Sequence, residues 1–394
     1  MLVLQKERFI EYPIIYLINM KRHGNLYNEI SSLFNLHKAH RHARKGKTHY
    51  TEVQQVDKNK YELLEKLHKK MVNQTYTTGK YKIKQIYEPK ERTIYALPYY
   101  PDRIVQHAIM NVLQPIWDKV FIYDLYSAIP KKGIHKAINR LTHFLDDTKN
   151  TTYCLQFDIK SYYPSMNHKI LMTTIKRKIK CRKTLWILQD VVDSLGDETN
   201  IPIGNYLSQY FGNLYLNDFD HWLKEEQKTK YYIRYNDDGI ILSGSKDELW
   251  NLLSEIRDYI ETRLQLKLNA KTRVYPVDKV GIDFLGYKTY RTHTLLRKRT
   301  VNKFKHKIKE IKKHHTEMKN QHIVSSVMSY VGWMQHGNCY NLLNKYILKD
   351  EQIGEIMNQC SRELGHKNPL KLKYGDYQTG NIYIAPTQFL LYDV

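Results

Sequence analysis

Three aspartates are the residues of this sequence best suited to chemistry. Asp158 ends a run of strand-forming residues, and Asp237 and Asp238 are adjacent in the turn Asn236-Asp237-Asp238-Gly239. Neighbouring carboxylates raise each other's pKa because like charges repel. A divalent cation relieves that repulsion, and oxygen ligands from neighbouring strands suit Mg²⁺, a pair of which can promote phosphoryl transfer. Such a turn by itself is more often an exposed loop, so the surrounding motifs must decide.

The elements expected around these aspartates place them at strand ends. Apolar runs predict strands over 153–159, 231–235 and 240–243, and the Asn-Asp-Asp-Gly turn is typical of a hairpin. Helical spacing predicts helices from about residue 168, over 207–222 and over 246–264, followed by strands near 272–275 and 284–289. This order favours an α+β fold, in which helices cover one face of an antiparallel sheet.

The flanking regions have their own patterns. A helix is predicted over 52–72, strands between 80 and 97, and a helix over 102–120. Residues 291–346 are helical and rich in lysine, and the last 40 or so residues show little pattern. Five histidines in or near this region (His293, His314, His315, His322 and His336) have no repeated spacing and no cysteine partners, so they are interpreted as surface or core residues.

Composition favours a polyanionic partner. The 394 residues contain 63 Lys and Arg against 40 Asp and Glu, a formal net charge of +23, and nucleic acid is the commonest partner of so basic a chain. Four separated cysteines argue against a zinc site or a disulfide scaffold. The apolar stretch 10–20 is short and is interrupted by Glu11 and Pro13, so no membrane span or anchor is predicted. These features predict a cytoplasmic protein.

Four motifs together resemble those of reverse transcriptases (RNA-directed DNA polymerases). The turn with its preceding residue, Tyr235-Asn236-Asp237-Asp238, resembles the YxDD box of that family, and three further segments resemble its other motifs in the same order. These are residues 157–165 (FDIKSYYPS), 201–209 (IPIGNYLSQ) and 283–287 (DFLGY). The resemblance covers roughly residues 35–345 and implies a right-hand polymerase with fingers, palm and helical thumb.

Details resemble the reverse transcriptases of diversity-generating retroelements most closely. The 201–209 motif closes in Ser208-Gln209, and it carries Ile203 where many polymerases have glutamine. Residues 86–92 and 101–108 resemble finger motifs of that group. This resemblance implies a bacterial or phage origin, a template-repeat RNA, a small basic accessory protein as partner, and frequent errors opposite template adenines. An isoleucine at position 203 offers only van der Waals contact, which weakens discrimination between correct and incorrect base pairs.

The resemblance implies a role for each matched residue near the metals. Asp158 and Asp237 would ligate two Mg²⁺ ions, for which Mn²⁺ could substitute, and Asp238 would complete the acidic triad. The backbone carbonyl of Ile159 would join the metal shell. Tyr163, five residues after Asp158, would be the steric gate that rejects a 2′-hydroxyl; its alternative is a half-buried core aromatic.

The remaining matched residues would hold the nucleotide and the nucleic acid. Lys90 and Arg92 would grip the triphosphate of a dNTP. Ile203, Gly204 and Gln209 would line the nucleotide pocket, and Lys271 would reach the primer–template or the nucleotide, although a plain surface lysine is nearly as good an interpretation. Basic residues over 297–313 would follow the phosphates of an RNA–DNA hybrid, unless they form an ordinary solvated face.

Several alternatives stay open. A retron-type or phage-defence reverse transcriptase would keep the chemistry and change the biology, whereas an inactive RNA-binding scaffold would have lost its acidic triad. The expected domains are a basic N-terminal extension (1–50), fingers (51–150), a palm (151–290), a thumb (291–350) and a C-terminal tail (351–394). Part of the fingers is expected to insert near 170–200.

Overall fold

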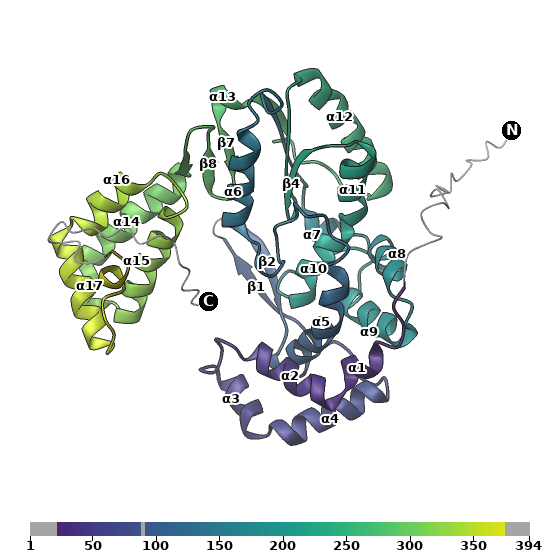
Figure 1. Cartoon of the computed structure of the whole chain (residues 1–394). Coiled ribbons are helices and arrows are strands. Elements are labelled where there is room, and N and C mark those ends of the chain that lie inside the picture. Colours follow the sequence, from purple (N-terminus) through teal and green to yellow (C-terminus); the bar gives the residue numbers. More distant parts are fainter. Residues whose placement is uncertain (1–21, 88–90, 375–394) are drawn as a thin grey trace. The chain divides into compact units, whose positions relative to one another are not determined.

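The computed structural model describes residues 22–87 and 91–374. They divide into two compact units, each built from segments distant in sequence. The first unit takes residues up to Ile129 with Phe157–Gly239 and Leu252–Thr272, and the second takes Pro130–Gln156, Ile240–Asn251 and residues from Arg273 onward. Figure 1 labels their helices and strands. Within the described residues, no helix has both the length and the apolar character needed to cross a membrane.

The N-terminal part of the first unit is helical. Its helices are α1 (Tyr27–Ser31), α2 (Leu33–Ala43), α3 (Thr51–Lys58), α4 (Lys60–Val72) and α5 (Ile104–Trp117). Helix α2 packs against α5, and its Leu36 and Ala39 are fully buried. The single helix predicted over 52–72 is instead two helices, because Asn59 has non-helical dihedral angles (φ −114°, ψ 25°). Asparagine favours such a break because its side chain competes for backbone hydrogen bonds.

The strands predicted between residues 80 and 97 form a hairpin. Strand β1 (Lys82–Ile86) pairs antiparallel with β2 (Arg92–Ala96), and Ile86 lies opposite Arg92. Every residue of β1 is exposed, whereas β2 is half-buried after its first residue. The hairpin is therefore attached to the rest of the unit mainly through β2.

A four-stranded sheet carries the three aspartates. Its order is β4–β5–β3–β6, with bounds Tyr231–Tyr235, Asp238–Ser243, Tyr153–Asp158 and Arg273–Pro276. Strand β3 runs antiparallel to β6, with Cys154 opposite Tyr275. The predicted strands are confirmed, and β5 begins two residues earlier than expected because the turn before it has only two residues, Asn236 and Asp237.

Helices and aromatic side chains accompany this sheet. The helices are α7 (Tyr162–Ser165), α8 (His168–Lys178), α9 (Arg182–Val192), α10 (Tyr206–Tyr215), α11 (Asn217–His221) and α12 (Lys246–Asp258). Within the first unit, the buried rings of Phe157, Phe219 and Tyr232 pack with centroids 6.0–6.5 Å apart. This mixture of helices and small antiparallel sheets confirms the predicted α+β class.

The second unit contains a hairpin where one strand was predicted. Residues 284–289 do not form a single strand: β7 (Ile282–Phe284) turns into β8 (Tyr287–Thr289), which pairs with β9 (Thr294–Leu296). The turn residues Leu285 (φ 50°) and Gly286 (φ 88°) are both left-handed, which a strand cannot accommodate. Helices α6 (Ile134–Leu145) and α13 (Val277–Val280) belong to the same unit.

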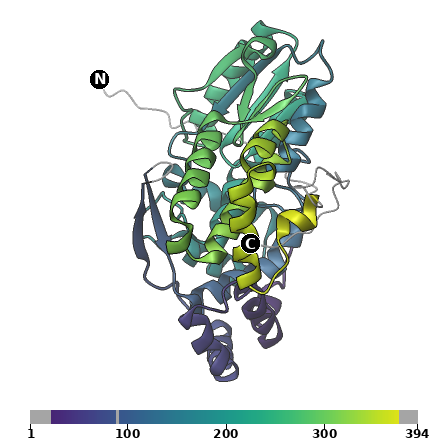
Figure 2. The ribbon, with the colours of Figure 1, turned by 90° about the vertical axis from the view of Figure 1, so that its left-hand side faces the viewer.

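The C-terminal helices pack on one another. They are α14 (Lys298–His314), α15 (Asn320–Met334), α16 (Tyr340–Leu343), α17 (Glu351–Glu363) and α18 (Pro369–Tyr374). Figure 2 shows the long green and yellow helices side by side, and α17 contacts both α14 and α15. Residues 351–363, expected to lack pattern, thus form an amphipathic helix whose buried side includes Ile353, Met357 and Cys360. The predicted domain boundaries stay predictions.

Candidate active site

The segment after β3 is fixed by a second stretch of chain. Lys160 N donates to the Lys267 carbonyl over 2.8 Å, and Ile159 forms a bridge with Leu268. Asn269 then binds Asp158 twice: its backbone N donates to the Asp158 carbonyl (2.7 Å) and its Nδ2 to Asp158 Oδ2 (2.9 Å). The orientation of the Asp158 carboxylate is therefore set by Asn269, a residue to which the sequence analysis gave no role.

The β4–β5 hairpin is the second part of the site. Asn236 begins its turn at φ 56°, a left-handed conformation that asparagine tolerates better than most residues. Gly239 lies on β5 beneath the ring of Phe157: a Cβ atom at position 239 would lie only 2.1 Å from Phe157 Cζ. Because Phe157 precedes Asp158, this close packing draws the end of β3 against the hairpin.

Asp158 and Asp237 act on each other electrostatically. Burial raises the pKa of the Asp237 carboxyl, and the negative charge of Asp158 raises it further. The two carboxylates therefore interact, and their predicted roles as metal ligands stay a prediction. Over the described residues, however, no three His, Cys, Asp or Glu side chains are grouped so that they could hold a metal ion. The roles of Asp238 and of the Ile159 carbonyl in a metal shell stay predictions.

A buried ion pair contacts the backbone of the β4–β5 turn. Arg234 and Asp220 both have fully buried side chains, and Arg234 Nε donates to Asp220 Oδ1 over 2.7 Å. Arg234 Nη1 donates to the Asn236 carbonyl (2.7 Å), while Asn236 N donates to Ser127 Oγ (2.9 Å). Ser127 Oγ in turn donates to Asn213 Oδ1. The backbone of the turn is therefore held on both sides by buried polar groups.

Tyr163 connects the two carboxylate segments. Its hydroxyl donates to Asn236 Oδ1 (2.9 Å), and Asn236 Nδ2 donates to Asp237 Oδ1 (2.9 Å). Burial raises the pKa of Tyr163, the charge of Asp237 raises it further, and the charge of Arg92 opposes them. The charges of Asp237 and Arg92 therefore both act on Tyr163, and the contact of Arg92 with a triphosphate stays a prediction. Lys90 lies outside the described residues.

The 201–209 motif is attached to the β1–β2 hairpin. Tyr95 N donates to the Ile203 carbonyl over 2.7 Å, and Asn205 Nδ2 donates to the Tyr81 hydroxyl over 2.7 Å. Gly204 adopts φ 125°, and a Cβ atom there would lie 2.5 Å from the Tyr95 carbonyl oxygen. A larger residue at this position would have to move the hairpin. The backbone conformation and the close contact with Tyr95 therefore both require glycine at position 204.

Ile203, Gln209 and Lys271 are accessible to different degrees. Ile203 is half-buried, whereas Gln209 and Lys271 are exposed. Lys271 N donates to Asn269 Oδ1 over 3.1 Å, which places it two residues from the support of Asp158. What these three side chains contact during a reaction stays a prediction.

Comparison with known proteins identifies the family. The sequence profile described as "Reverse transcriptase (RNA-dependent DNA polymerase)" matches residues 81–289, which is more than half of the chain. The chain therefore belongs to the reverse transcriptase family, and the α+β class predicted for it is that of a right-hand polymerase.

Individual relatives have low sequence identity to this chain. Protein YkfC of Escherichia coli (strain K12) is 26% identical over 246 residues, which cover 52% of this chain and 63% of YkfC. The group II intron-encoded protein LtrA of Lactococcus lactis subsp. cremoris is 21% identical over 283 residues, covering 52% of this chain and 47% of LtrA. The matched part thus spans less than two thirds of the length of these curated relatives. Among solved structures, apo telomerase from Candida tropicalis aligns at 13% identity with a TM-score of 0.45, covering 76% of this chain and 65% of that one.

Proposed function

We propose that this chain is an RNA-directed DNA polymerase, which extends a DNA primer with deoxynucleotides on an RNA template. One observation carries the proposal: Asp158, at the end of β3, and Asp237, in the turn between β4 and β5, are close enough that the charge of Asp158 raises the pKa of Asp237. Two like charges this close lower the stability of the fold, and carboxylates with raised pKa values cluster at functional sites. Family membership and the nearby Tyr163 and Arg92 support the same chemistry.

The close pair Asp158 and Asp237 is the part of the described site that a divalent metal ion would bind. Enzymes of this family generally use them, and the repulsion between Asp158 and Asp237 is what a bound cation relieves. Asp158, Asp237, Asp238 and the Ile159 carbonyl would hold two Mg²⁺ ions. When bound, such ions supply Lewis-acid activation of a primer 3′-hydroxyl and stabilise the departing pyrophosphate oxygens.

The chain's own residues bind and select the nucleotide. Arg92 presents a forked guanidinium to the triphosphate, with Lys90 as a second positive charge. The Tyr163 ring, whose hydroxyl is bonded to Asn236, would act as the steric gate that rejects a ribose 2′-hydroxyl. The motif residues Ile203, Gly204 and Gln209 line the pocket for the base pair, Lys271 lies close to the primer–template, and the basic face of α14 follows the hybrid backbone.

Primer extension on an RNA template tests the polymerase activity. Asp237→Asn removes one negative charge from the pair, so we expect extension to fall at least a hundredfold while the fold persists. Asp247→Asn is the matched control, because Asp247 is an exposed residue of α12. If Asp237→Asn extends primers as wild type does, the metal-site assignment is wrong. If the wild-type chain binds RNA and fails to extend any primer, it is the inactive RNA-binding scaffold.

The finer biology is proposed from the motif residues. Ile203 and the Ser208-Gln209 ending favour a diversity-generating retroelement, with a template-repeat RNA and a small basic accessory protein as partners. A retron-type or phage-defence enzyme is the alternative. The neighbouring genome distinguishes them: a pair of near-identical repeats that differ at adenines supports the first, and a retron-type noncoding RNA supports the second. Either setting places the protein in the cytoplasm of a bacterium.

A further inference from the structure

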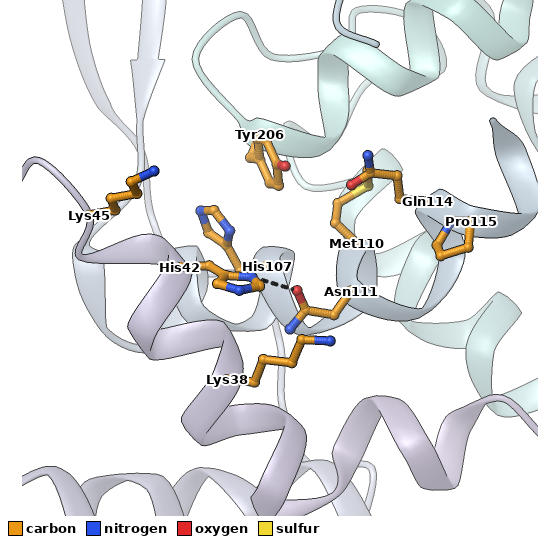
Figure 3. Close-up of a pocket in the computed structure, with 9 residues that line it drawn as sticks. All are labelled: Lys38, His42, Lys45, His107, Met110, Asn111, Gln114, Pro115 and Tyr206. Carbon is orange, nitrogen blue, oxygen red and sulfur yellow. Dashed lines mark hydrogen bonds between the residues drawn. The ribbon is translucent and has the colours of Figure 1, made fainter. Parts of the chain in front are cut away.

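The first unit contains a pocket of about 390 Å³ where α2 and α5 meet the first residue of α10, and none of the three aspartates lines it (Figure 3). A volume of this size is within the range of small-ligand pockets, about 300–1,000 Å³. None of the functions proposed above uses it. The residues that line it are Lys38, His42, Lys45, His107, Met110, Asn111, Gln114, Pro115 and Tyr206.

The charges in this pocket are of one sign. Lys38 and Lys45 bring two ammonium groups, and no aspartate or glutamate is among the lining residues. Both lysines come from the basic segment 37–47, on α2 and just after it. Lysine ammonium groups bind phosphate oxygens as point charges. The pocket therefore favours an anionic ligand, and a phosphate above all.

Hydrogen bonds orient the third basic group, His42. Asn35 Nδ2 donates to the carbonyls of Ile30 and Ala108, so Asn35 Oδ1 accepts from Asn111 Nδ2 over 2.9 Å. Asn111 is left with its Oδ1 atom facing His42 Nδ1 at 2.9 Å, the contact drawn in Figure 3. His42 Nδ1 therefore carries the hydrogen, and Nε2 is the ring nitrogen that a ligand would meet.

Two flat rings also line the pocket. His107 and Tyr206 stack with centroids 4.3 Å apart and planes 19° from parallel. Burial, together with the charges of Arg103, His42 and Lys47, lowers the pKa of His107 to about 4. The His107 ring is therefore neutral at pH 7. Neutral stacked rings give a surface on which an unpaired base can stack, a mode common in proteins that bind single-stranded nucleic acid.

The pocket is joined to the nucleotide motif through Tyr206. Tyr206 N donates to the buried Gln106 Oε1 over 2.8 Å, which fixes the start of α10 against α5. Ile203 and Gln209 each lie three residues from Tyr206 in the same motif. A nucleic-acid strand bound at this pocket would therefore contact Tyr206, which belongs to the same short motif as the residues proposed to contact the newly formed base pair.

We propose that this pocket binds one nucleotide of a single-stranded nucleic acid, with its phosphate at Lys38, Lys45 and His42 and its base against the His107–Tyr206 rings. The inference rests on the proposed function, in which the single strand is the unpaired RNA template. A base within a duplex has both faces stacked on its neighbours, so only an unpaired nucleotide can use these rings. Binding at this pocket needs neither metal nor dNTP.

Equilibrium binding of a fluorescein-labelled, unprimed RNA oligonucleotide to the full chain tests the proposal. Tyr206→Ala should weaken binding at least about fivefold, because stacking on an aromatic ring contributes about 1–3 kcal/mol per base. Tyr206→Phe keeps the ring and should bind within about twofold of wild type. Lys38→Gln should lower the dependence of log affinity on log salt concentration by about 0.7, the value for one phosphate contact to a single strand.

Two controls make the test specific. Lys66→Gln removes an equal charge from an exposed site on α4 and should leave affinity nearly unchanged, because Lys66 does not line the pocket. Circular dichroism checks that Tyr206→Ala remains folded, and Lys38→Gln provides a second test because Lys38 is a half-exposed residue. A single-stranded DNA of the same sequence, run in parallel, shows whether RNA or DNA is the preferred strand.

The outcomes separate this inference from the proposed function. If Tyr206→Ala and Lys38→Gln both bind RNA and DNA as wild type does, the pocket is not a nucleotide site, whatever the polymerase activity. If they weaken binding and Lys66→Gln does not, the pocket is confirmed even when the wild-type chain fails to extend a primer. Equal weakening by Lys38→Gln and Lys66→Gln overturns the inference, since the effect is then one of net charge.

Discussion

The Tyr163 hydroxyl donates a hydrogen bond to Asn236 Oδ1 over 2.9 Å, although the two residues are 73 positions apart in the chain. Asn236 passes the contact on to Asp237 through its own amide. A residue expected to read the sugar and a residue expected to hold metal thus share one side-chain partner. Selection of the nucleotide and placement of the carboxylate are therefore linked by a single asparagine.

Replacing the Tyr163 ring tests its role as the gate. Tyr163→Val opens space beneath the sugar, so we expect the ratio of kcat/KM for rNTPs to that for dNTPs to rise at least about tenfold. Tyr163→Phe keeps the ring and should hold that ratio within about threefold of wild type, although it loses the bond to Asn236. Single-nucleotide primer extension measures both. An unchanged ratio in Tyr163→Val would show that the ring is a core aromatic.

The Arg234–Asp220 pair lets stability and activity be separated. Arg234→Met leaves the buried Asp220 charge without its partner, so unfolding free energy should fall by about 3–5 kcal/mol. Adding Asp220→Asn removes that charge and keeps an acceptor for the Tyr232 hydroxyl, so much of the stability should return. Activity should stay low, because the Asn236 carbonyl still lacks its donor. Denaturant unfolding and primer extension measure the two effects; full activity in the double variant would refute the supporting role of Arg234.

Ile203→Gln tests the proposed low fidelity. The Ile203 carbonyl, bonded to Tyr95 N, is unaffected by the change, whereas the half-buried side chain gains groups that hydrogen-bond. We expect misincorporation opposite template adenines to fall severalfold, because a polar contact penalises a misaligned pair. Steady-state incorporation of each dNTP opposite adenine measures it, and Ile203→Leu is the apolar control. Equal error rates in all three proteins would remove Ile203 from the explanation.

The stacked pair His135–His336 makes the second unit sensitive to acid. The rings lie 3.5 Å apart; burial and the charge of His336 lower the pKa of His135 to about 4, and burial and Lys373 lower that of His336. In the unfolded chain these histidines take up protons near pH 6.5. The contribution of the neutral pair to the free energy of unfolding is therefore fully present above that pH and is lost as the pH falls toward about 4.

Removing one ring checks this acid sensitivity. His336→Gln should show a smaller drop in its thermal unfolding temperature between about pH 7.5 and about pH 5 than wild type does, because one group that takes up a proton on unfolding is gone. His366→Gln is the matched control, since His366 is exposed, and it should follow the wild-type curve. The explanation fails if both variants show the same pH dependence.

Short sequence patterns predicted most of the individual strands, turns and helices. The hairpin that bears Asp237 followed from its turn residues, and the strand before Asp158 from its apolar run. The break at Asn59 and the two-residue turn at Leu285-Gly286 were missed, because helical and strand periodicity continue across both. Helix α17 was missed although Ile353, Met357 and Cys360 have the spacing that would have identified it.

The parts of the site that sequence reasoning missed depend on distant partners. Asn269 binds a residue 111 positions away, and its type gives no sign of that partner. Arg234 is one of 63 basic residues in a chain whose charge predicts surface contacts, yet it is fully buried. Only the meeting of separate segments distinguishes these residues from ordinary loop and surface positions.

The packing of Phe157 on Gly239 has a consequence for how this chain can change over time. The benzyl ring fills the volume that any side chain at position 239 would need. The two positions are therefore free to vary only as a pair, with a larger group at one matched by a smaller group at the other. Because each adjoins an aspartate of the site, such an exchange would have to happen without moving either carboxylate, which leaves this pair of residues very few acceptable alternatives.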